Sequence, residues 1–114
     1  MMRRIYVAGK LRASAVDYIK NVHKMITGAN ELRKLGFSVY VPCLDFLMGV
    51  VCGDYDYHTY FYNSQPWLRA ADAIFVLPGH ERSRGVKREV RSAKRWDIPV
   101  FYDIEKLKKW RDGE

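Results

Sequence analysis

Four short runs of apolar residues, separated by longer segments with helical periodicity, organise this sequence. The runs cover residues 4–8, 37–41, 73–77 and 98–102 and are typical of buried strands. Between the first two runs, apolar side chains recur every three or four positions: Val16, Ile19, Val22, Ile26, Ala29 and Leu32. This spacing predicts an amphipathic helix that ends at Gly36. We expect Ser14 and Asp17 to form a capping box at its start.

Strands and helices alternate without a hairpin signal, which predicts right-handed βαβ units and a parallel sheet. The alternation resumes after residue 66, where Pro66 is expected to open a short helix that ends before Asp72. We therefore expect one α/β domain over residues 1–114. It should be a three-layer sandwich of the Rossmann-like or flavodoxin-like type, with a mainly parallel sheet of four to five strands and helices on both faces. No GxGxxG or Walker pattern follows the first strand, which disfavours a dinucleotide-binding domain or a P-loop ATPase.

Residues 43–66 are the least regular part of the pattern and are rich in aromatic side chains. Tyrosines crowd there around Asp54, Asp56 and His58. One interpretation is an active-site flap, in which tyrosine rings stack on a base while an acid or a histidine protonates a leaving group. The other is a helix over residues 56–63 whose tyrosines pack on the core or on a second subunit.

The apolar run at 73–77 leads through a Pro-Gly turn and a polar loop into a helix that begins near Arg84 or Gly85. A helical winding places three apolar side chains on one face and the basic ones on the other. The apolar residues are Val86, Val90 and Ala93, and the basic ones are Lys87, Arg88, Arg91, Lys94 and Arg95.

Glu89 is the only acid of this helix and borders its apolar face. The residues three and four positions away are Gly85, Val86, Ser92 and Ala93, and none of them is basic. Glu89 could therefore meet a basic residue of another element or be solvated at the edge of the face. The functional interpretation is a nucleophile or general base at the mouth of a pocket, kept ionised by the helix dipole.

The net charge of +7 and the pI near 9.5 favour an anionic partner, which could be a nucleotide, a nucleic acid or an acidic protein, although a well-solvated basic surface explains the charge as well. No apolar run reaches the ~18 residues that a membrane span needs, so we expect a cytoplasmic protein without membrane contact. Cys43 and Cys52 have no metal-binding spacing and are expected to be reduced structural thiols. We expect neither a metal nor a cofactor.

Five stretches carry a resemblance to a known family. In chain order they are IYVAG at 5–9, GFSVYVP at 36–42, WLRAADAI at 67–74, LPG at 77–79 and SRGVKREV at 83–90. They are similar to the nucleoside 2-deoxyribosyltransferase-like superfamily, and most of all to its small, often phage-encoded members and to the nucleoside 5′-monophosphate N-glycosidases. The similarity spans nearly the whole chain, and its most specific piece is the Ser-x-Gly-small-x-x-Glu run at residues 83–89.

The resemblance implies roles for several residues. Glu89 matches the glutamate that attacks the sugar C1′ and forms a glycosyl-enzyme, which water or another base then resolves. Ser83, with the backbone around Arg84 and Gly85, matches the phosphate-binding turn of the monophosphate hydrolases. Free N–H groups and the dipole at a helix start suit an anion there.

The same resemblance implies that Tyr6 and Gly9 match the strand end at the floor of the pocket. Gly9 would let the ligand approach the backbone, and Asp45 would reach the sugar. The sequence departs from the family pattern at Ser64, where catalytic members usually carry an aspartate. A serine donates a hydrogen bond but does not work as an acid near neutral pH.

Because of this departure, either Asp54, Asp56 or His58 takes over the acid role, or the chain keeps the pocket and has lost much of the chemistry. The resemblance favours an N-glycosidase or deoxyribosyltransferase that cleaves a nucleoside 5′-monophosphate with Glu89 as nucleophile, in the manner of a retaining glycosidase. The candidate catalytic set is Glu89, Ser64, Asp54 and His58.

Two alternatives remain open. The first is a non-catalytic protein that binds or sequesters a nucleotide, which the missing aspartate supports. The second is a nucleic-acid binder that uses the basic face of the helix at 84–95 together with the tail residues Lys106, Lys108, Lys109 and Arg111. The resemblance also implies a homodimer or larger homo-oligomer, and the aromatic segment 55–62 is the expected contact. A phage-encoded protein would work in the host cytoplasm.

Overall fold

The computed structural model describes residues 2–11, 14–53 and 56–114. Four parallel strands form one sheet in the order β2-β1-β3-β4. They are β1 (Arg4–Ala8), β2 (Ser38–Tyr40), β3 (Ala73–Val76) and β4 (Val100–Phe101). The predicted strands are confirmed, although β4 is three residues shorter than expected because only two of its residues pair with β3.

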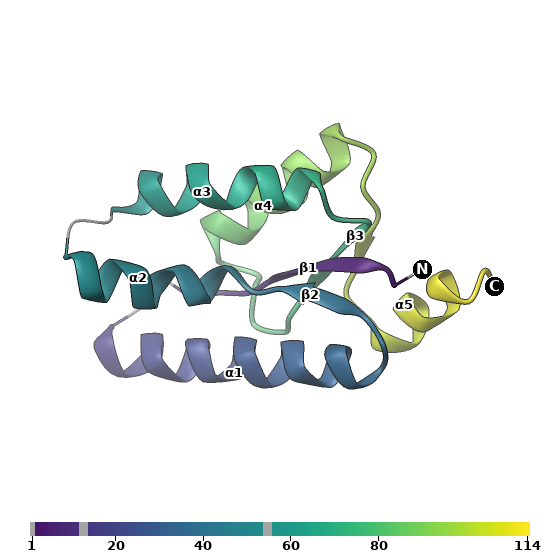
Figure 1. Ribbon diagram of the computed structural model, residues 1–114, viewed down its shortest axis with the longest axis horizontal. Coiled ribbons are helices and arrows are strands. Elements are labelled where there is room, and N and C mark those ends of the chain that lie inside the picture. Colours follow the sequence, from purple (N-terminus) through teal and green to yellow (C-terminus); the bar gives the residue numbers. More distant parts are fainter. Residues whose placement is uncertain (1, 12–13, 54–55) are drawn as a thin grey trace.

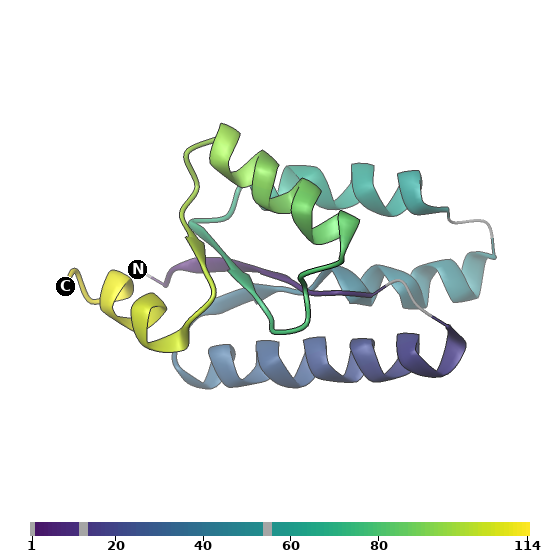
Figure 2. The same ribbon diagram turned by 180° about the vertical axis from the view of Figure 1, so that it is seen from behind.

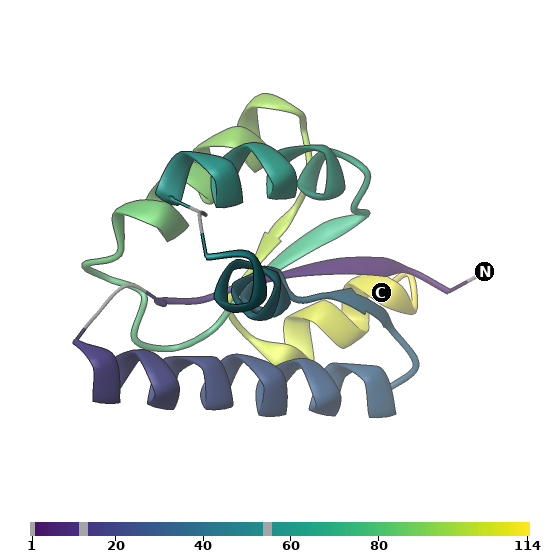
Figure 3. The same ribbon diagram turned by 60° about the vertical axis from the view of Figure 1, so that its left-hand side comes forward.

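Helices cover both faces of the sheet (Figures 1 and 3). Helices α1 (Ala15–Lys34) and α5 (Ile104–Arg111) lie on one face, while α3 (Tyr57–Arg69) and α4 (Arg84–Arg95) lie on the other. This arrangement confirms the three-layer α/β sandwich, here with an all-parallel sheet of four strands.

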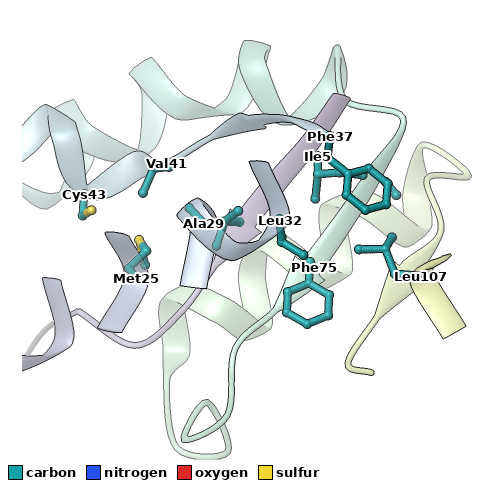
Figure 4. Close-up of a cluster of buried hydrophobic side chains, with 11 residues drawn as sticks. Ile5, Met25, Ala29, Leu32, Phe37, Val41, Cys43, Phe75 and Leu107 are labelled. Carbon is teal, nitrogen blue, oxygen red and sulfur yellow. The ribbon is translucent and has the colours of Figure 1, made fainter. Parts of the chain in front are cut away.

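The central strand β1 is buried on both faces, and its side chains alternate between the two layers. Ile5 and Val7 belong to the cluster on the α1 side, which also holds Leu32 and Leu107 (Figure 4). Tyr6 and Ala8 belong to the other cluster, where Leu68 of α3 and Val86 and Ala93 of α4 pack. The alternation therefore directs the one hydroxyl of this strand into the α3–α4 layer.

The helix considered over residues 56–63 is present as the first part of α3, and most of the less regular segment before it is helical as well. A 3-10 turn, η1 (Pro42–Leu44), leads into α2 (Asp45–Cys52), and α3 follows. The separate helix expected to open at Pro66 is also wrong, because Pro66 lies inside α3. Proline deprives the Tyr62 carbonyl of its helical donor, but both residues are exposed, so water can bond that carbonyl and the helix continues.

Two expectations about α1 are wrong. Ser14 is its N-cap residue, but its hydroxyl donates to the Asp17 carboxylate at 3.3 Å instead of accepting a backbone N–H, so no capping box forms. The apolar stripe is also only partly buried. Ala29 and Leu32 are in the core, whereas Val16 and Ile19 near the start of the helix are 65% and 68% exposed.

Both cysteines are free thiols. Cys43 is buried in the α1-side cluster, as expected of a structural thiol, whereas Cys52 is exposed at the end of α2. Within residues 2–11, 14–53 and 56–114, no helix combines the length and the apolar character needed to cross a bilayer.

Replacement of Leu32 by alanine should destabilise the fold by about 2–5 kcal/mol, because the side chain is fully buried against β1 and β3. Ile26→Ala is the matched control on the same helix. Its side chain is 43% exposed, so the loss should be below about 1 kcal/mol. Urea unfolding followed by circular dichroism measures both changes, and equal losses would contradict the packing of α1 described here.

Candidate functional site

The α3–α4 layer holds a hydroxyl–carboxylate contact between two residues singled out in the sequence. Glu89 lies on the inner side of α4, one turn after the buried Val86. The hydroxyl of Tyr6, which is fully buried on β1, donates a hydrogen bond to Glu89 Oε2. Glu89 itself is half-buried. Among the described residues its carboxylate makes no ion pair, so the basic partner considered from the sequence is not present there.

Burial of this contact shifts the acidity of both groups. It raises the pKa of Glu89 from 4.5 to about 7, although the hydrogen bond from Tyr6 acts in the opposite direction by favouring the ionised carboxylate. The pKa of Tyr6 is also raised, first by burial and then by the negative charge of Glu89. Near neutral pH, Glu89 therefore exists in both its ionised and its protonated form while Tyr6 keeps its proton.

Ser64, on the inner side of α3, lies against the same pair. It is only 6% exposed and donates to the Phe61 carbonyl at 3.1 Å. It is also close enough to Tyr6 for a hydrogen bond that lowers the pKa of the phenol. The position at which the resemblance implies an aspartate is thus beside Tyr6, and here it brings a neutral hydroxyl.

A second polar contact lies next to the first, at the end of β2. Tyr40 pairs in register with Tyr6, and their rings stack at 5.4 Å between centroids. The Tyr40 hydroxyl donates to Asp45 Oδ2 at 3.3 Å, and the Asn63 amide donates to the same oxygen at 3.0 Å. Trp67 also stacks on Tyr40, at 5.5 Å between ring centroids.

The pKa of Tyr40 connects the two contacts. Burial raises it, and the charges of Asp45 and Glu89 raise it further, so both carboxylates act on this one phenol. The sequence analysis named Asp45 but missed Tyr40, Asn63 and Trp67. The signal for Tyr40 was the shared face of two neighbouring parallel strands, since a period of two puts it beside Tyr6.

The turn before α4 has the features of an anion-binding helix start. Ser83 is the N-cap, and its hydroxyl oxygen accepts the N–H of Val86 at 3.2 Å. The N–H groups of Arg84 and Gly85 belong to the first turn, where an α-helix offers no carbonyl partner of its own. The side chains of Arg82 and Arg84 are exposed beside this turn.

Gly9 does not face the polar cluster. A Cβ atom at this position would come within 3.1 Å of Met25 and 3.2 Å of Leu77, so a side chain there would crowd the α1 side. A small hollow there, of about 30 Å³, is lined by Gly9, Lys10, Asn21, Lys24 and residues 77–79. Tyr6 and Glu89 do not line it, and they lie on the other face of the sheet.

The remaining acid candidates are not gathered at Glu89 in the same way. His58 is exposed on the first turn of α3, almost two turns before Ser64, and its ring stacks on Tyr62. Asp56 caps the start of α3 by accepting the Thr59 N–H at 2.9 Å, and this bond lowers its pKa. Asp54 lies outside the described residues. Over the described part of the chain, no cluster of three or more His, Cys, Asp or Glu side chains could hold a metal ion.

The chain matches one family model, described as "Domain of unknown function (DUF4406)", over residues 3–102. The matched range contains every strand of the sheet and all residues of the two polar contacts. No curated protein matches the sequence.

Replacement of Glu89 by glutamine should stabilise the fold in a pH-dependent way. The pKa of Glu89 is higher in the folded protein than the ordinary value of 4.5. Its protonated form is therefore favoured by folding, and wild-type stability declines as the pH rises from about 4.5 to about 7. Glutamine does not titrate, so Glu89→Gln should gain about 2–3 kcal/mol over the wild type at pH 8 and little at pH 4.5.

Thermal unfolding at pH 4.5, 6 and 8 measures this difference. Glu81→Gln is the matched control, because Glu81 is an exposed acid just before α4, and it should change stability by less than about 0.5 kcal/mol at each pH. A Glu89→Gln protein no more stable than the wild type at pH 8 would show that Glu89 is not buried as described.

Proposed function

The chain belongs to the DUF4406 family, and for this member we propose an N-glycosidase or deoxyribosyltransferase that cleaves the N-glycosidic bond of a nucleoside 5′-monophosphate. The observation that carries the proposal is the half-buried Glu89 carboxylate held by the buried hydroxyl of Tyr6. A carboxylate with a single fixed hydrogen bond and a raised pKa is poised for a nucleophilic or proton-transfer role.

In the proposed reaction, ionised Glu89 attacks C1′ of the sugar. A C–O bond forms, the bond from C1′ to the base nitrogen breaks, and its electron pair leaves with the base, which takes up a proton. Water then hydrolyses the glycosyl ester, or a second base attacks C1′ instead. The Tyr6 hydroxyl occupies one carboxylate oxygen, so it orients the other toward the sugar.

The start of α4 is proposed to bind the 5′-phosphate. It is six residues before Glu89, and the first-turn N–H groups and the positive end of the helix dipole favour an anion. The Ser83 hydroxyl uses its oxygen to cap the helix and still has a hydrogen to donate to a phosphate oxygen. The exposed guanidinium of Arg84 adds positive charge at the same turn.

The departing base needs a proton that Ser64 does not supply. We infer that Asp45 assists it, because Tyr40 and Asn63 hold this carboxylate and its charge acts on the same phenol as Glu89 does. In this proposal Asp45 has the role that the resemblance assigns to an aspartate at position 64.

A second candidate function is a protein that binds a nucleotide without cleaving it. Ser64 favours this candidate, since a buried, neutral hydroxyl next to Tyr6 keeps a polar group at the site without the acid that the resemblance implies there. Release of free base distinguishes the proposed enzyme from a protein that only binds the nucleotide.

A homodimer or larger assembly is also part of the proposal. Exposed apolar side chains at the start of α1 and along α2 support it, and they are Val16, Ile19, Met48 and Val51. Placement in the cytoplasm, or in the host cytoplasm for a phage protein, stays a prediction.

Release of free base from a panel of ribo- and deoxyribonucleoside 5′-monophosphates, measured by chromatography, tests the proposal directly. The wild type should release base from at least one substrate, and Glu89→Gln should be slower by about 10³-fold or more, since removal of a nucleophile abolishes the covalent step. The activity should rise with pH through about 7, because the attacking carboxylate must be ionised.

Glu81→Gln is the control for this experiment and should keep wild-type activity. Tight binding of a monophosphate by the wild type without any base release would transfer the assignment to the binding protein. Full activity in Glu89→Gln would exclude Glu89 as nucleophile.

Replacement of Ser83 by aspartate tests the phosphate site without removing the helix cap, because aspartate caps a helix as well as serine does. The added negative charge should raise KM for monophosphates at least about tenfold, equivalent to about 1.4 kcal/mol, and leave KM for nucleosides nearly unchanged. Ser83→Thr keeps the hydroxyl and serves as control. If Ser83→Asp affects nucleosides and monophosphates equally, the phosphate binds elsewhere.

A further inference from the structure

The outer side of α4 carries an unusual concentration of positive charge. Its twelve residues contain six basic side chains and a single acid, Glu89. Four arginines recur at spacings of four, three and four: Arg84, Arg88, Arg91 and Arg95. This spacing places them in one stripe about 16 Å long, which we call the arginine ridge. Lys87 and Lys94 lie beside it.

The ridge points to solvent. Arg84, Arg91 and Arg95 are exposed, and no ion pair among the described residues engages any of these three. Arg88 is half-buried, and its guanidinium lies 3.8 Å from the centre of the Phe61 ring of α3. The ridge is therefore a row of guanidinium groups fixed at one point by contact with an aromatic ring.

The neighbouring helix borders the ridge with aromatic side chains and no acid. Figure 2 shows α4 (bright green) in front of α3 (teal), both in the layer above the sheet. None of the residues of α3, Tyr57–Arg69, is acidic. Tyr62 is 71% exposed and meets Phe61 edge to face at 5.8 Å between centroids. At the other end, the Arg69 guanidinium lies over the ring of Trp96.

The only acid of the two helices is turned away from this surface. Glu89 lies on the inner side of α4, where it accepts the hydrogen bond from Tyr6. The outer surface of the α3–α4 layer thus combines a row of arginines with an exposed tyrosine ring, without interspersed negative charge. Solvated basic surfaces usually mix both signs, so a one-signed row beside a ring indicates a specific anionic partner.

We propose that the arginine ridge and Tyr62 form a binding surface for single-stranded nucleic acid. Arginine guanidiniums pair with successive phosphates, and an unpaired base stacks on the exposed ring of Tyr62. Unpaired bases are needed for stacking, which favours a single strand over a duplex. A lipid surface fits less well, because Val86 and Ala93, the apolar side of α4, are buried against the sheet and leave nothing to insert.

Fluorescence anisotropy with a labelled 20-nucleotide oligothymidylate, between 50 and 300 mM salt, tests the surface. Arg91→Ala with Arg95→Ala should weaken binding about tenfold or more at low salt and should reduce the slope of log K against log salt by about 1.4, which corresponds to two phosphate contacts. The matched control is Lys106→Ala with Lys109→Ala. It removes the same charge from two exposed lysines of α5, on the other face of the sheet, and should change affinity less than about twofold.

Tyr62 supplies a second, independent readout. Tyr62→Leu should weaken binding about fivefold or more because it removes the ring, whereas Tyr62→Phe should bind as the wild type does. The substituted side chains are all exposed, and they are Arg91, Arg95, Lys106, Lys109 and Tyr62. Circular dichroism of each variant checks that the fold is unchanged.

Three results would overturn the proposal. Equal losses of affinity in the α4 and α5 double variants would show that net charge alone accounts for the binding. A duplex of the same length bound more tightly than the single strand, with no effect of Tyr62→Leu, would exclude stacking. Absence of oligonucleotide binding, together with ridge-dependent binding to vesicles containing phosphatidylserine, would assign the surface to a membrane. Glu89→Gln should bind the oligonucleotide normally, so this proposal and the proposed enzymatic function fail separately.

Discussion

The hydrogen bond from Tyr6 to Glu89 is the contact on which the rest of the candidate site depends. It exists because two periodicities meet: alternation along β1 turns Tyr6 into the α3–α4 layer, and the helical repeat of α4 turns Glu89 toward the same point. Burial of Val86 and Ala93 fixes α4 against the sheet and so holds the carboxylate in place. Burial also raises the pKa of this carboxyl group to about 7. Folding therefore holds the Glu89 side chain in place and at the same time disfavours its ionised form.

Helix α4 combines three features in one short sequence. Its start, capped by Ser83, leaves N–H groups for an anion, its inner side presents Glu89, and its outer side presents the arginine ridge. The three do not compete because each uses a different part of the helix surface. The apolar residues that anchor α4 occupy only a narrow stripe of its surface, and α3 and the sheet together bury that stripe. A basic outer side is therefore compatible with a buried inner acid, and the two can be tested apart.

The sequence was most informative where packing is two-sided and least where one element extends past another. Strands β1 and β3 were predicted correctly because residues buried on both faces form unbroken apolar runs. The apolar stripe of α1 predicted burial wrongly at Val16 and Ile19. Twenty residues of helix span about 30 Å and five residues of β1 only about 16 Å, so the first turns of α1 extend past the sheet.

Helix α2 was missed because its sequence is apolar on every side of the helix. The continuity of α3 was missed because Pro66 lies in an exposed turn, where water can bond the carbonyl that the proline leaves without a donor. In the site, Glu89 was found from the helical pattern and Ser64 by resemblance, whereas Tyr40 was missed because its partner on β1 is visible only once the register is known.

Serine at position 64, where the resemblance implies an aspartate, also affects the charge of Glu89. An aspartate at this position would bring a second negative charge to the Tyr6 hydroxyl and hence close to Glu89, and like charges raise the pKa of a buried carboxyl group further. A neutral hydroxyl avoids that repulsion, so Glu89 can ionise near neutral pH in spite of its burial. In the proposed reaction the proton for the leaving base must then come from another group, and Asp45 and Tyr40 are the nearby residues with an ionisable side chain. With serine at position 64, the two carboxylates that act on Tyr40 come from different elements, Glu89 from α4 and Asp45 from the start of α2.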